Sequence, residues 1–204
     1  TFDSAITHAA TANATMVDSD GLLKWRPHNL LKYSEQFDNA AWGKTGATVT
    51  ANALAAPDGT LTADKLVEST STGSHAVKQT ITYDGGVPTT FAAFVKAGET
   101  DVIQLWSGSA GDRFVAIADL SLGTITADTS LGGAVYLSSS ISAVGDGWYY
   151  ISVTGTMPSG TYSPLLMLDN GVTRSYTGDG TSGIYIWGAH AYRSDLGGMV
   201  NNPT

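Results

Sequence analysis

Residues 145–154 read Gly-Asp-Gly-Trp-Tyr-Tyr-Ile-Ser-Val-Thr, a glycine-rich turn followed by alternating apolar and polar side chains. An alternation with a period of two places successive side chains on opposite faces of a β-strand. One face carries the three candidate core side chains Tyr149, Ile151 and Val153. The other face carries the three outward side chains Trp148, Tyr150 and Ser152. The stretch therefore predicts a strand with one face in a core.

The same alternation recurs along the chain, in Phe91–Lys96, Val102–Trp106, Arg113–Leu120, Pro164–Leu168 and Gly183–Trp187. Glycine, aspartate and serine turn signals separate these runs, and short strands spaced in this way are typical of a β-sandwich or barrel. Only Tyr33–Trp42 has a helical apolar spacing, and it is long enough for just one or two turns. The sequence predicts an all-β protein.

The composition excludes several classes of function. The 204 residues include 10 basic and 18 acidic residues, for a net charge of −8, and no cysteine. Binding to nucleic acid requires clustered lysine and arginine, which no stretch supplies. No run approaches the roughly 18 apolar residues of a membrane span. We therefore expect neither binding to nucleic acid nor insertion into a membrane. The absence of cysteine removes disulfides, thiol catalysis and thiolate metal sites.

The chain divides into three parts by pattern. Residues 1–28 form an extended lead-in with a hairpin predicted around Ser19-Asp-Gly21, and residues 29–193 carry the strand pattern. Residues 194–204 have no pattern and are expected to be a tail or the start of a further segment. A lead-in of this kind cannot build its own core, so it is expected to pack on the main domain or on another chain.

Four phrases carry a resemblance to a known domain. They are Asn29–Trp42, Ala56–Lys65, Gly145–Ser152 and Tyr176–Ala189, with a similar lead-in at Ala12–Leu23. In this order they resemble a domain of tailed-phage fibre and spike proteins. The resemblance implies an antiparallel jelly-roll β-sandwich similar to carbohydrate-binding modules, with an extended N-terminal segment and a virion or extracellular location. The family usually continues with Gln-Leu-Glu where this chain has His190, Ala191 and Tyr192.

No motif supports catalysis, and we expect no enzyme activity. The four histidines are scattered, no Gly-x-Ser-x-Gly elbow is present, and the glycine-rich stretch 178–183 lacks the residues of a phosphate loop. A glycosidase needs two carboxylates at a defined separation. Asp119, Asp169 and Asp179 could supply a pair, but eighteen acidic residues make such a pairing unspecific.

The alternation along the strands predicts which side chains face outward, and these could form a sugar-binding platform. Aromatic faces and planar polar groups are the groups that recognise sugars. The outward side chains predicted to share one outer face are Phe94, Lys96, Gln104, Trp106, Trp148 and Tyr150. These aromatics could instead be covered by the lead-in or by a neighbouring subunit. Trp42 and Trp187 lie in the resembling phrases and are expected in the core.

Two further sets of residues are candidates. Arg113 and Arg174 flank loops, where each could bind the carboxylate of a uronic or sialic acid or simply be solvated. We expect no required cofactor. The sequence leaves room for a structural calcium ion, whose carboxylate ligands would come from Asp58, Asp64 and Asp179. Ordinary Asp-Gly turns explain Asp58 and Asp179 equally well.

The leading hypothesis is a non-catalytic carbohydrate-binding domain of a phage-like fibre or spike that adheres to host surface or capsular polysaccharide. Its partners would be glycans and other virion subunits, in a homo-oligomer for which a trimer is favoured. One alternative is a structural or oligomerisation module without a ligand, in which the outer aromatics lie between chains. Another is an accessory module of a polysaccharide-degrading enzyme.

Overall fold

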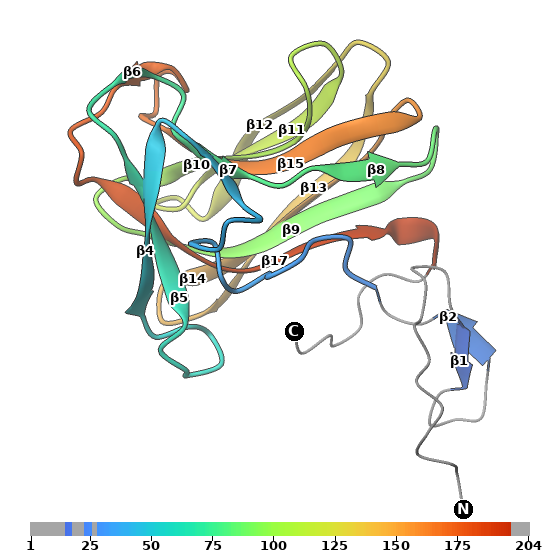
Figure 1. The fold of residues 1–204 in the computed structure, drawn as a ribbon, viewed down its shortest axis with the longest axis horizontal. Helices are drawn as coiled ribbons and strands as arrows, with labels where there is room; N and C mark the ends of the chain where they lie inside the picture. The colour runs from blue at the N-terminus through green and yellow to red at the C-terminus, as the bar shows by residue number, and fades with distance from the viewer. Residues whose placement is uncertain (1–14, 18–22, 26–27, 197–204) are drawn as a thin grey trace, which may run out of the picture.

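The computed structural model describes residues 15–17, 23–25 and 28–196, the first two ranges by their backbone alone. Alternating side chains produce strands throughout, and these residues contain no α-helix. Two large antiparallel sheets pack face to face (Figure 1). We call them the β10 sheet and the β9 sheet, each after one of its inner strands.

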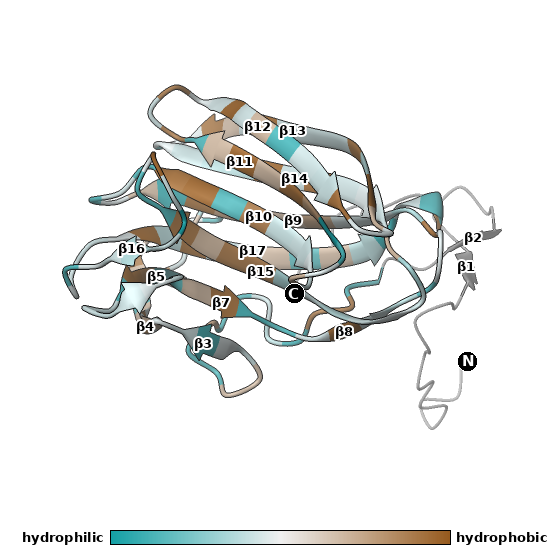
Figure 2. Ribbon diagram, turned by 90° about the horizontal axis from the view of Figure 1, so that it is seen from above, coloured by the Kyte–Doolittle hydropathy of each residue, from teal (hydrophilic) through white to brown (hydrophobic). Residues whose placement is uncertain are grey.

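The β10 sheet has the strand order β12-β11-β10-β15-β7-β3, and β8 also pairs with β15 (Figure 2). Its strands are β3 (Gly43–Thr45), β7 (Ala76–Lys78), β8 (Ile81–Tyr83), β10 (Val102–Gly108), β11 (Arg113–Asp119), β12 (Thr124–Leu131) and β15 (Gly160–Asp169).

The β9 sheet has the strand order β13-β14-β9-β17-β5-β4. Its strands are β4 (Ala47–Leu54), β5 (Ala63–Glu68), β9 (Thr89–Ala97), β13 (Val135–Gly145), β14 (Trp148–Thr156) and β17 (Gly183–Arg193). The chain crosses between the two sheets after β3, β5, β8, β9, β12, β14 and β15. These repeated crossings wind the sandwich as a jelly roll, as the sequence predicted.

Small elements complete the fold. Strands β1 (Thr15–Val17) and β2 (Leu23–Trp25) form a separate two-stranded antiparallel sheet with Thr15 opposite Trp25, which agrees with the predicted hairpin. Strands β6 (Thr72–Gly73) and β16 (Tyr176–Thr177) pair with each other, and η1 (Ser194–Leu196) is a single 3-10 turn. How the lead-in packs lies outside the described residues.

The core follows the predicted parity closely. Phe91, Val95, Ile103 and Leu105 are fully buried between the sheets, together with Ile151. Full burial of side chains of this size contributes about 1.5–3 kcal/mol each to folding, which is the main stabilising term of such a sandwich.

The segment before β3 bonds to β17 of one sheet and to Gln79, which follows β7 of the other, so it bridges the two sheets without forming a helix. Its backbone makes three successive i to i+3 bonds, donated by the N–H groups of Gln36, Asn39 and Trp42. Phe37 and Trp42 are buried, with ring centroids 4.7 Å apart. The predicted helical turn is therefore a chain of tight turns, because both aromatic anchors are directed into the core.

Candidate functional site

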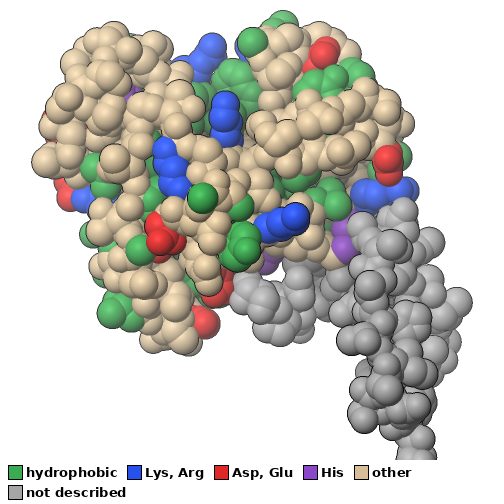
Figure 3. All heavy atoms as spheres, in the orientation of Figure 1, with side chains coloured by type: hydrophobic (Ala, Val, Ile, Leu, Met, Phe, Trp, Pro, Cys, Tyr) green, Lys and Arg blue, Asp and Glu red, His purple; other side chains and the backbone are tan. Residues whose placement is uncertain are grey.

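A groove lies on the outer face of the β10 sheet, and we call it the Trp106 groove. Its volume is about 630 Å³, within the range of ordinary ligand sites. The residues that line it come from six strands and three loops, and they include Lys78, Trp106, Arg113, Leu165, Met167 and Arg174. Figure 3 shows basic side chains around a notch in the upper surface of the molecule, above this sheet.

Strand register explains why these residues meet. Trp106 pairs with Val115 of β11 on one side and with Leu165 of β15 on the other, and Leu165 in turn pairs with Lys78 of β7. Paired residues share a face, and neighbouring strands lie about 4.8 Å apart. Trp106 and Lys78 therefore lie two strands apart on one outward row.

Gly108, which lines the groove, lets the chain at the start of β11 lie close against the end of β10. It lies two residues beyond Trp106 on the same face of β10, with a φ of +143°. A Cβ atom there would come within 2.2 Å of the Asp112 carbonyl oxygen, so no side chain can occupy the position without a shift of the backbone.

Two arginines cover the indole of Trp106. The guanidinium carbon of Arg113 lies 4.6 Å from the ring centroid and that of Arg174 lies 4.9 Å away, both within cation–π distance. Trp106 is consequently only 7% exposed. The sequence correctly predicted its outward direction, but a ligand would meet the arginines before the ring.

The arginines differ in how they are held. Arg113 donates from Nη1 to the Ala110 carbonyl at 2.6 Å, and burial, with the nearby charge of Arg174, lowers its pKa from the usual value. Arg174 is exposed in the loop between β15 and β16. No ion pair joins Arg113, Arg174 or Lys78 to a carboxylate within residues 28–196.

Gln104 also faces outward on β10 but is not available to a ligand. It is buried, and its Nε2 donates to Asp169 Oδ2 at 2.7 Å. The other oxygen of Asp169 accepts the Gly171 N–H at 2.9 Å, which fixes the start of the loop that carries Arg174. Gln104 therefore helps to hold, through Asp169, the loop that carries Arg174.

The predicted single platform is wrong, because its residues lie on two different sheets. Trp106 and Gln104 lie on the β10 sheet, whereas Phe94, Lys96, Trp148 and Tyr150 lie on the β9 sheet. The chain crosses between sheets after β9, and the outer faces of a sandwich point in opposite directions. Parity gives the face of each strand but does not give its sheet.

The β9 sheet carries its own outer cluster, which we call the aromatic surface: Phe94, Trp148, Tyr150, Tyr185 and Trp187. The Phe94 ring lies 4.9 Å from that of Tyr150 and 5.2 Å from that of Trp187. Trp148 is buried and donates from its indole nitrogen to the Ala55 carbonyl, and Lys96 donates to the Asp146 carbonyl.

Trp187 is not in the core, contrary to the prediction. Ile184 and Ile186 face inward, so Trp187 faces outward, where its Nε1 donates to Thr62 Oγ1 at 3.0 Å. A bulge follows at Gly188, whose φ is +58°, and it reverses the parity so that Ala189 and Ala191 are buried.

The three carboxylates proposed for calcium are not brought together. Asp58 Oδ1 accepts bonds from Thr60, and Asp179 accepts bonds from Thr181 and Ser182, so both stabilise their own turns. Asp64 is buried and accepts the N–H groups of Phe37 and Asn52. Within the described part of the chain, no group of three histidine or acidic side chains is arranged for a metal ion.

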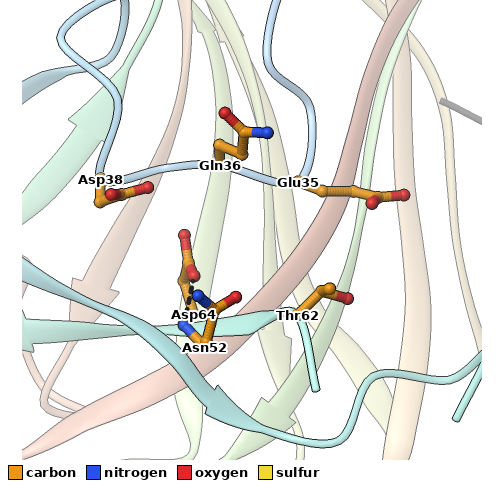
Figure 4. Close-up of a pocket in the computed structure, with 6 residues that line it drawn as sticks. All are labelled: Glu35, Gln36, Asp38, Asn52, Thr62 and Asp64. Atoms are coloured by element: carbon orange, nitrogen blue, oxygen red, sulfur yellow. Dashed lines mark hydrogen bonds between the residues drawn. The ribbon is translucent and has the colours of Figure 1, made fainter. Parts of the chain in front are cut away.

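Asp64 instead borders a small acidic pocket that the sequence did not predict. Glu35 and Asp38 line it with Asp64, Gln36, Asn52 and Thr62 (Figure 4). The Asp64 carboxylate extends from β5 toward the turn segment that carries Glu35 and Asp38. Burial raises the pKa of Asp64, with a smaller contribution from the negative charge of Asp38.

This raised pKa predicts how stability changes with pH. Between the unfolded value near 3.8 and the higher folded value, the folded state binds more protons, so stability falls as pH rises through that window. Unfolding in urea at pH 7 to 4 should show the wild type gaining stability relative to Asp64→Asn as the pH falls. A difference that stays constant or shrinks on acidification would contradict this assignment.

The carboxylates considered for catalysis have structural partners. Asp119 Oδ1 accepts the N–H groups of Ser121 and Leu122, and Asp169 and Asp179 hold the contacts described above. These bonds fix turns and loops.

Comparisons with known proteins give structural neighbours alone. No family model and no curated protein matches the chain. The enzymatically active domain of tailspike protein 4 of bacteriophage CBA120 matches 81% of this chain and 21% of its own, with 16% identity and a TM-score of 0.48. This chain therefore spans about a fifth of that tailspike chain.

Two carbohydrate-binding modules are further neighbours. The CBM22-1 xylan-binding domain of Paenibacillus barcinonensis Xyn10C matches 82% of this chain and 95% of its own, with 11% identity and a TM-score of 0.44. TmCBM61, solved with β-1,4-galactotriose, matches 81% of this chain and 99% of its own, with 12% identity and a TM-score of 0.36.

In the described residues, no helix is long and apolar enough to cross a membrane.

Proposed function

We propose that this protein is a non-catalytic carbohydrate-binding domain that binds polysaccharide in the Trp106 groove. The observation that carries the proposal is the convergence of Trp106, Arg113 and Arg174 over an apolar floor that includes Leu165 and Met167. Sugars present an apolar ring face and a rim of polar groups, and such a groove offers a surface for each.

The resemblance of four sequence phrases to fibre and spike domains supports a place on a phage-like virion, with attachment to host surface or capsular polysaccharide. A shallow groove on one sheet face is suited to weak binding, with a dissociation constant of about 10 μM to 1 mM. Several copies in a homo-oligomer, such as a trimer, would raise the effective affinity through avidity.

A polysaccharide array with two matched tryptophan variants tests the proposal. Trp106→Ala should weaken binding about tenfold or more, because both arginines lose the surface on which they stack. Trp187→Ala removes an outward tryptophan from the opposite sheet and should leave binding unchanged. Circular dichroism of each variant checks its fold.

Two outcomes would contradict the proposal. No binding of the wild type to any polysaccharide would reject the function. Loss of binding in Trp187→Ala with retention in Trp106→Ala would place the site on the aromatic surface instead.

A structural module is the second candidate function, and the aromatic surface favours it. Phe94, Tyr150, Tyr185 and Trp187 are each partly exposed on the outer face of the β9 sheet. Aromatic side chains are enriched at the centres of protein interfaces. Light scattering of the wild type and of Trp187→Ala would test this function. A structural module predicts that the wild type is an oligomer and that the Trp187→Ala variant dissociates.

A further inference from the structure

We propose that the Trp106 groove selects acidic saccharides, whose ring carboxylate is held between Arg113 and Arg174. The inference rests on the proposed function and adds the chemical class of the ligand. The lining includes three of the ten basic residues of the chain and none of its 18 acidic residues, although the net charge is −8.

The arrangement of the two guanidinium groups is unfavourable without an anion. Both lie within 5 Å of the centroid of the same indole, and the positive charge of Arg174 contributes to lowering the pKa of Arg113. Like charges at short range repel, most strongly where burial reduces screening by water. A carboxylate between them would convert this repulsion into attraction.

The nearest acidic side chains do not supply that carboxylate. Asp169 binds Gln104 and Gly171, as described above. Asp112 precedes Arg113 but accepts the Gly133 N–H at 2.7 Å and the Tyr162 hydroxyl at 3.3 Å. The other basic groups with acidic partners, Lys65 and Arg193, lie outside the groove.

The shape of the groove favours a uronic acid within a polysaccharide. The planar guanidinium group matches a carboxylate in two parallel hydrogen bonds, which a lysine cannot reproduce. Leu165, Met167 and Ala76 give the floor an apolar strip beside the arginines. A uronate carries its carboxylate on the rim of a ring with an apolar face, so one sugar would satisfy both features.

The test compares polygalacturonate, neutral dextran and dextran sulfate by titration calorimetry at about 0.1 M salt. The full chain should bind polygalacturonate at least tenfold more tightly than dextran. Arg174→Gln should weaken that binding at least fivefold, and Arg174→Lys should restore little of it. Because Arg174 is exposed and outside the core, neither variant should alter the fold.

Lys32→Gln is the matched control, since it removes one positive charge at an exposed position outside the groove. It should leave the affinity unchanged. An equal loss in Lys32→Gln and Arg174→Gln, or tighter binding of dextran sulfate, would overturn the inference in favour of general attraction between charges. If the protein binds neutral polysaccharide with an affinity that Arg174→Gln does not change, the inference is overturned while the proposed function stands. Failure to bind any polysaccharide would reject both.

Discussion

Trp42→Ala should lower the free energy of unfolding by about 3–5 kcal/mol, because it leaves a cavity under the turns that precede β3. Trp42 is 1% exposed, packs against Phe37 and donates from its indole nitrogen to the Tyr33 carbonyl at 2.9 Å. A loss of this size is comparable to half of the stability of an ordinary domain. Urea unfolding of the two proteins measures it directly.

Trp187→Ala is the matched comparison for this prediction. The side chain is of equal size but lies partly exposed on the aromatic surface. Its truncation leaves a space that is open to solvent, so the free energy of unfolding should fall by only about 1–2 kcal/mol. Equal losses in the two variants would contradict the assignment of Trp42 to the core and of Trp187 to the outer face.

Glu68→Ala should have the second large effect, on both stability and binding. Glu68 is 5% exposed, and its carboxylate accepts the Tyr176 hydroxyl at 2.6 Å and the Asp179 N–H at 2.8 Å. Removing it leaves two donors unpaired, for a loss of about 2–4 kcal/mol. Burial, reinforced by this carboxylate, also raises the pKa of Tyr176, so the hydroxyl stays a proton donor.

Glu68 is expected to act on binding through Arg174, which precedes Tyr176 by two residues. The milder Glu68→Gln variant should weaken polysaccharide binding, and combining it with Arg174→Gln should add little, because both changes remove the same contact. Additive losses in the double variant would show that Glu68 has no role in positioning Arg174.

The sequence predicted the strands and their inward faces well, since a period of two is a local property. It placed Phe91, Ile103 and Ile151 inside and Phe94, Trp106 and Trp148 outside, as the structure does. It could not assign β9 and β10 to different sheets. That choice depends on pairing partners such as Lys96 with Trp148, which are distant in sequence.

The errors within single elements have local causes. The bulge at Gly188 changes the parity within β17, and a pattern of fixed period does not anticipate it. The expectation that Trp187 lies in the core rests on its place in a resembling phrase, but its neighbours Ile184 and Ile186 already fill that side of the strand. The proximity of Arg113 and Arg174 could not be predicted from the sequence either, because it depends on the path of the loop that carries Arg174.

Saccharide is expected to bind in the Trp106 groove and not on the aromatic surface. The most direct measurement is the titration of a galacturonate oligosaccharide into 15N-labelled protein, following the indole N–H signals of the five tryptophans. Single Trp→Phe variants assign the signals. We predict a saturable shift of the Trp106 signal, with those of Trp148 and Trp187 unchanged. Shifts of Trp148 and Trp187 with an unchanged Trp106 would contradict the claim.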